Sequence, residues 1–135
     1  MKQFGWRMAA VLLAAAVLLF LLPRIRVRAF TTLHSGRIEN ALAYGNGIPG
    51  GLGIKAVNTW EGEHTMTEII LGYGFGDCQY YGCYYSPDDV PLAFQNVETE
   101  LAAVGKTAWT WADEQGNHGM TSRLKDGWCY FEASF

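Results

Sequence analysis

The residues best suited to chemistry are one cysteine and two histidines. Cys78 follows an aspartate in the run over 76–79, and His64 and His118 lie before and after it in the chain. A nucleophilic cysteine needs a base that makes the thiolate. Cys78 with His64 or His118 therefore gives one hypothesis, a cysteine hydrolase, although no complete catalytic motif surrounds the cysteine.

Carboxylates and histidines in two expected turns give a second hypothesis, a metal-binding module. The candidate ligands are Glu61 and His64 in one turn and Asp113 and His118 in the other. These side chains suit zinc or calcium if the two turns meet. Their spacing matches no recognised metal motif, and solvated turn residues are the commoner role. We therefore expect no metal and no cofactor.

Aromatic side chains on neighbouring strands form a third group, which is suited to binding. The candidates are Tyr80, Tyr81, Tyr84, Tyr85, Trp109 and Trp111. Alternation places Tyr80 and Tyr84 on one face of the sheet and Tyr81 and Tyr85 on the other. Exposed rings would form a platform for sugar rings or a partner peptide. The alternative is a cross-strand aromatic ladder that only stabilises the sheet.

The elements that must position these residues form a single domain over residues 30–135. A helix is expected over 31–44, where Ile38 and Leu42 share one face and glycines follow. Period-two alternation then predicts strands at 54–60, 67–73, 80–85, 97–101, 107–112 and 120–135, with a break at Asp126-Gly127 in the last. A short helix over 97–104 competes with the fourth strand, since its residues also favour a helix.

This pattern predicts an α+β fold, in which the helix packs on one face of a largely antiparallel, meandering sheet. The sheet would have five or six strands. A small β-barrel with a helix is the alternative.

The charges divide the chain into a basic leader and an acidic body. Five of the ten Lys and Arg residues lie in the first 29 positions, and all 13 Asp and Glu residues follow them. The five remaining cations cannot form a basic face, which excludes nucleic acid as a partner. At 135 residues the chain is also too short for a multidomain enzyme.

The leader, residues 1–29, has the pattern of a signal peptide or a membrane anchor. Met8–Leu22 is an unbroken apolar run, with basic residues on both sides. Residues 4–22 would form a helix of about 28 Å, at ~1.5 Å per residue, which is enough to cross a hydrocarbon core. Cleavage after Ala29 is the alternative, although the three arginines at 24, 26 and 28 fit a signal peptide poorly.

We therefore expect either a single-pass membrane protein or a secreted one. In the first case the N-terminus stays inside the cell and the body, residues 30–135, lies outside, since the α-amino group adds to the charge of the N-terminal side. In the second case the chain is cleaved near Ala29 and released.

The three cysteines cannot all pair with one another. Export would allow a disulfide between Cys83 and Cys129 or between Cys78 and Cys83. The other interpretation is that Cys83 and Cys129 are small buried residues. A domain of about 106 residues buries enough surface to fold without such a bond.

Three motifs of the body occur at Tyr80–Pro91, at Asn117-His118-Gly119 and at the C-terminal Tyr130–Phe135. Together they resemble a group of short proteins from Gram-positive bacteria that also carry an N-terminal apolar segment. The resemblance covers most of the body, implies a membrane-anchored or exported single domain, and brings no catalytic residues. With the leader it favours a non-enzymatic binding module at the cell envelope, whose partner is an unknown envelope protein or glycan. The hydrolase and the metal-binding module are the alternatives.

Overall fold

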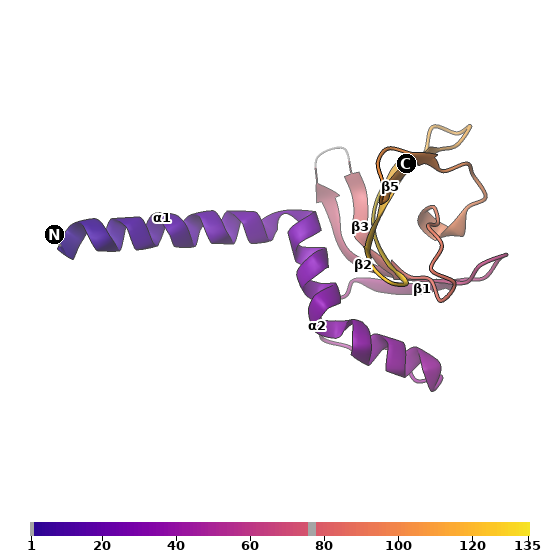
Figure 1. Cartoon of the computed structure of the whole chain (residues 1–135), viewed down its shortest axis with the longest axis horizontal. Coiled ribbons are helices and arrows are strands. Elements are labelled where there is room, and N and C mark those ends of the chain that lie inside the picture. The colour runs from indigo at the N-terminus through magenta and orange to yellow at the C-terminus, as the bar shows by residue number, and fades with distance from the viewer. Residues whose placement is uncertain (1, 76–77) are drawn as a thin grey trace.

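The fold combines two N-terminal helices with one antiparallel sheet (Figure 1). A computed structural model describes residues 2–75 and 78–135. Helix α1 covers Lys2–Leu21 and helix α2 covers Pro23–Ala43, and within the described residues the sheet has seven strands. The predicted α+β class is therefore confirmed, whereas the predicted number of five or six strands is wrong.

The apolar leader forms α1, which runs away from the rest of the molecule (Figure 1). Its alanines and leucines are strong helix formers. The side chains of residues 5–17 lie exposed: Trp6 is 82%, Val11 65% and Leu13 68% exposed. Among the residues whose placement is described, no helix combines the length and the apolar character that crossing a membrane requires.

Helix α2 is longer than the helix predicted over 31–44, because it begins at Pro23. Proline suits the first helical position, where its fixed φ is already helical and its missing N–H costs no bond. The helix ends in a Schellman motif: Asn46 N–H donates to Ala41 O over 2.8 Å, and Gly45 N–H donates to Leu42 O over 3.2 Å. Gly45 has a φ of +67°, which glycine adopts without strain.

The strands pair in an order that is not a meander. In chain order they are β1 (Ala56–Trp60), β2 (Met66–Phe75), β3 (Cys78–Tyr85), β4 (Ala102–Ala103), β5 (Ala108–Ala112), β6 (His118–Lys125) and β7 (Trp128–Ser134). In space the order is β1-β2-β3-β7-β6-β5-β4, and all neighbours are antiparallel. Strand β7 takes the centre because Trp128 to Phe131 are buried on both faces.

The segment between β3 and β4 differs most from the prediction. Residues 97–101 form neither the predicted strand nor the competing helix. They follow a short 3-10 turn, η1 (Phe94–Asn96), in which Gln95 has a φ of +57°. Phe94 is 2% exposed, so burial of this ring against the sheet, rather than strand pairing, fixes the segment.

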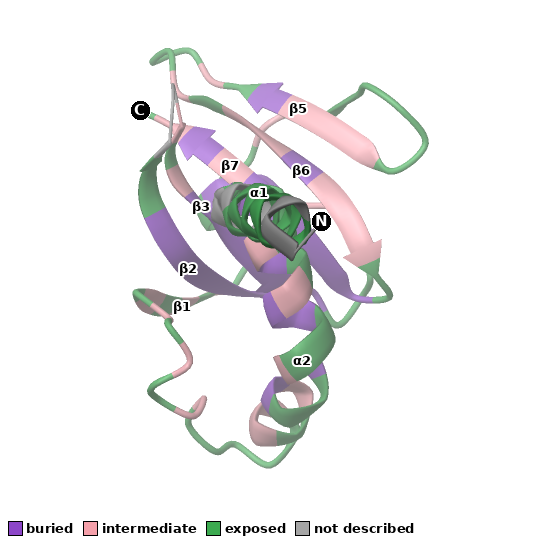
Figure 2. Ribbon diagram, turned by 90° about the vertical axis from the view of Figure 1, so that its left-hand side faces the viewer, coloured by how far each residue is buried: buried purple, intermediate pink, exposed green. Residues whose placement is uncertain are grey.

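Both faces of the sheet are covered, which gives two cores. Helix α2 covers one face, where Val27 and Ile38 pack with Cys83 and Trp128. The η1 segment covers the other face, where Phe94 packs in a cluster with Met66, Tyr84, Trp111 and Phe131. Figure 2 shows this burial on β2, β3 and β7, in contrast to the exposed α1.

The three cysteines are free thiols, so neither disulfide forms. Cys83 belongs to the core under α2, and Cys129 belongs to the core under η1. Their side chains therefore lie on opposite faces of the sheet, where no disulfide can join them. The interpretation of these two cysteines as small buried residues is confirmed.

Candidate binding site

Cys78 and His64 lie at opposite ends of β2. Cys78 pairs with Phe75 at one end of this strand, and His64 precedes Met66 at the other end. Ten residues at ~3.3 Å each place the two about 30 Å apart. The imidazole of His64 instead lies against Asp88, with Nδ1 2.9 Å from Oδ2. The pair predicted for a hydrolase is therefore not assembled.

Cys78 and His118 also have other partners. The thiol of Cys78 donates to Tyr80 O over 2.9 Å, and Nδ1 of His118 lies 3.0 Å from Gly116 O. Burial raises the pKa of the Cys78 thiol above its ordinary value, which disfavours the thiolate that a nucleophile needs. Gly76 and Asp77, which precede the cysteine, lie outside the described residues.

The proposed metal ligands are also kept apart, because their two turns join different strand pairs. Glu61 and His64 lie between β1 and β2, whereas Asp113 and His118 flank the turn between β5 and β6. The carboxylate of Asp113 accepts from the N–H of Gln115 and of Asn117, each over 2.9 Å. Within residues 2–75 and 78–135, no three His, Cys, Asp or Glu side chains form a cluster that could hold a metal.

Half of the predicted aromatic platform lies in the core. Tyr81, Tyr84 and Trp111 are 5% exposed or less, so a platform made of these rings is wrong. The cause is that α2 and η1 cover both faces of the sheet. The others, Tyr80, Tyr85 and Trp109, are partly exposed. Tyr85 packs on Trp128 of the neighbouring strand at 5.3 Å, as the cross-strand ladder predicts, whereas Tyr80 stacks on Phe94 of η1 at 5.5 Å.

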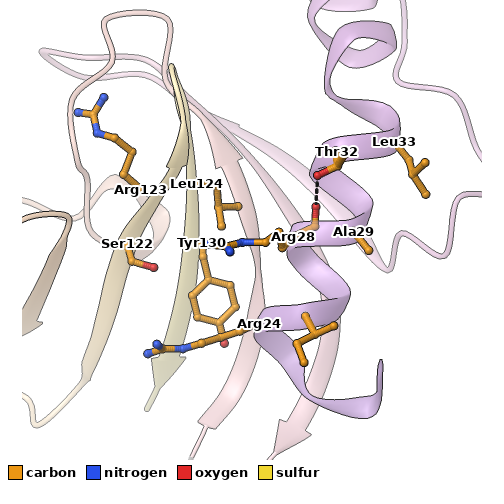
Figure 3. Close-up of a pocket in the computed structure, with 10 residues that line it drawn as sticks. Arg24, Arg28, Ala29, Thr32, Leu33, Ser122, Arg123, Leu124 and Tyr130 are labelled. Carbon is orange, nitrogen blue, oxygen red and sulfur yellow. Dashed lines mark hydrogen bonds between the residues drawn. The ribbon is translucent and has the colours of Figure 1, made fainter. Parts of the chain in front are cut away.

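A cavity between α2 and strands β6 and β7 is a better candidate (Figure 3). Its volume is about 660 Å³, within the usual range for small-molecule sites. Ile25, Ala29 and Leu33, spaced four residues apart on α2, lie along its helical border, and Ala29 and Leu33 project away from β6 and β7 in Figure 3. Leu124 and the ring of Tyr130 form the opposite wall on the sheet. The apolar surface between α2 and these strands is therefore that of Leu124 and Tyr130.

Two arginines add positive charge to the cavity. Arg24 and Arg28, four residues apart on α2, extend toward the strand that carries Tyr130 (Figure 3). The guanidinium of Arg24 lies 5.6 Å from the ring centre of Tyr130 and its Nε lies 4.0 Å from Glu132 Oε1. Arg28 has no carboxylate partner among the described residues. The cavity is therefore suited to an anionic group.

Arg123 lines the same cavity and Glu132 lies beside Arg24, and both have further partners. Arg123 turns away from α2 in Figure 3 and its guanidinium donates to the carboxylate of Asp89. This bond holds the pKa of Asp89 below its ordinary value. Glu132 accepts a hydrogen bond from the hydroxyl of Tyr130. Of the arginines that line the cavity, Arg28 is thus the one without a carboxylate partner among the described residues, whereas Arg24 shares its charge with Glu132.

Sequence reasoning missed this cavity because it assigned Arg24 and Arg28 to the leader. The two residues have the i, i+4 spacing of one helical face, and Ile25, Ala29 and Leu33 follow the same spacing. That spacing was the feature of the sequence that could have indicated a helix carrying Arg24 and Arg28 on one face. Nothing in the sequence indicated that this face of the helix would lie beside β6 and β7.

No family model, curated protein or solved structure matches the chain.

Proposed function

We propose that the protein is a non-enzymatic binding module of the bacterial cell envelope, attached to the membrane through α1. The observation that carries this proposal is the cavity between α2 and the sheet, because it offers an apolar interior with two arginines. The residues suited to catalysis or to metal binding support no such site, since each is paired elsewhere or lies far from its expected partner.

The attachment is supported by the exposed apolar surface of α1. Trp6, Val11 and Leu13 each expose more than half of their surface. Exposed apolar surface of this kind marks a contact with a membrane or a partner. Basic residues at both ends of the apolar run would remain with the lipid headgroups.

The core under α2 favours an uncleaved leader over cleavage after Ala29. Val27 is fully buried in that core, and Pro23 is also buried. Cleavage would remove both residues and would cut α2 after its first two turns. We therefore propose that the leader stays attached, with the body outside the cell.

Fractionation of cells that make the full chain tests this proposal. We expect the protein to sediment with membranes and to remain there after an alkaline carbonate wash, and protease added to intact cells should digest the body. The variant Leu12→Lys should reduce the membrane-bound fraction, because a lysine in an apolar helix opposes insertion. The control Val104→Lys changes a residue that is 59% exposed near β4, and it should leave the fraction unchanged. A wild-type chain found in the soluble fraction would refute the proposal.

A further inference from the structure

Helix α2 turns away from the direction of α1 and crosses the face of the sheet (Figure 1). The cavity therefore begins at the first turn of α2, directly after α1 ends at Leu21. If α1 lies in the membrane, as the proposed function states, the cavity opens at the depth of the lipid headgroups. This position favours a ligand that comes from the membrane itself.

The exposed face of α2 is both basic and apolar. Arg28 and Arg37, nine residues apart, lie at the two borders of this face, and Leu33 between them is 73% exposed. Glu39, the acidic residue of α2, accepts a hydrogen bond from Trp128 Nε1 over 2.7 Å and so faces the sheet. A helix with such a face suits the surface of an anionic membrane.

We propose that the cavity binds the headgroup of an anionic phospholipid. This assignment rests on the proposed attachment of α1 to the membrane. The guanidinium groups of Arg24 and Arg28 donate to the phosphate oxygens, since arginine matches the geometry of phosphate. Leu124 contacts the glycerol backbone and the first carbons of the acyl chains from the sheet side. The ring of Tyr130 holds Arg24 in position through its π face.

Short-chain lipids test this assignment with the full chain in uncharged detergent micelles. The measured quantity is the midpoint of thermal unfolding, which rises when a ligand binds the folded state. Dihexanoyl-phosphatidylglycerol should raise the midpoint, whereas dihexanoyl-phosphatidylcholine should not. Inorganic phosphate tests for a soluble anion in place of a lipid.

Two variants of the same helix provide the matched comparison. Arg28→Gln should weaken the apparent affinity for phosphatidylglycerol about tenfold, as expected for the loss of one hydrogen bond between charged groups. Arg37→Gln removes the same charge from a residue outside the cavity wall, and its affinity should stay within about twofold of the wild type. Arg24→Gln is a second test of the cavity. Each variant is compared with its own midpoint in lipid-free micelles.

Three results would overturn the assignment. Equal shifts with both lipids would show no preference for an anionic headgroup. Equal losses in Arg28→Gln and Arg37→Gln would show general surface attraction. A full shift with inorganic phosphate alone would identify a soluble anion as the ligand. A chain that fractionates with membranes but gives any of these results refutes the lipid assignment alone, whereas a soluble chain refutes the membrane attachment itself.

Discussion

Nη1 of Arg26 donates a hydrogen bond to the hydroxyl of Tyr81 over 2.7 Å. The same guanidinium lies 5.9 Å from the ring centre of Tyr81. Arg26 belongs to the basic leader of the sequence, whereas Tyr81 belongs to β3 near the centre of the sheet. The leader and the body are therefore joined by side-chain contacts as well as by the chain, and α2 is part of both.

Because α2 belongs to both the leader and the body, we predict that leader residues contribute to the stability of the body. Val27→Ala should lower the free energy of unfolding by about 2 kcal/mol, because it removes two methyl groups from a fully buried site. Ile25→Ala is the control on the same helix, since Ile25 is 38% exposed, and it should cost less than about 1 kcal/mol. Urea unfolding in uncharged detergent measures both. Equal small effects would contradict the place of Val27 in the core.

Two glycines should respond to alanine in opposite directions. A Cβ at Gly82 would lie 2.0 Å from Ile69 O, so Gly82→Ala should push β3 away from β2 and cost more than about 2 kcal/mol. A Cβ at Gly36 meets nothing within 4 Å, and alanine favours a helix. Gly36→Ala should therefore add about 0.5–1 kcal/mol to the free energy of unfolding. Thermal unfolding of both variants beside the wild type checks the pair, and a stable Gly82→Ala would contradict the close approach of the two strands.

Deprotonation of Glu68 should lower the free energy of unfolding as the pH rises. The carboxyl is fully buried, and it accepts from Asn58 Nδ2 over 3.3 Å and from Gln95 N–H over 2.9 Å. Burial raises its pKa above the ordinary value of 4.5. The folded chain then holds the proton more tightly than the unfolded chain does. This contribution to stability is complete below the unfolded pKa and is lost as the pH rises through the folded pKa.

The variant Glu68→Gln tests this sign, because glutamine stays neutral. Its free energy of unfolding should fall less between pH 4.5 and neutral pH than that of the wild type. Urea unfolding at a series of pH values gives the two curves. Parallel curves would show that Glu68 titrates alike in the folded and unfolded chains.

The period-two alternation in the sequence predicted which segments form strands better than it predicted the order of those strands in the sheet. Strands β1, β2, β3 and β5 lie close to the predicted ranges, because alternation marks a strand wherever it pairs. The pairing of β3 with β7 brings together residues such as Cys83 and Tyr130, which lie far apart in the chain. Alternation carries no information on that choice of partner.

The candidate site was less predictable than the fold. Tyr81, Tyr84 and Trp111 were predicted as binding residues from their type and their alternation on strands, but the burial of a ring depends on what covers the sheet. The cover on one face comes from Phe94, in a segment without periodicity. Arg24 and Arg28 were assigned to the leader, although they line the cavity that α2 forms with the sheet. That role depends on tertiary packing, which no local pattern encodes.

The mass of the mature protein is the decisive measurement, because we propose that the leader remains part of the folded, membrane-attached protein. Intact mass measurement of the chain purified from the membrane fraction should show residues 1–29 still present. A chain that begins at Phe30 and is found in the medium would contradict the account, because it would show that the body folds and leaves the cell without Val27 and the first turns of α2.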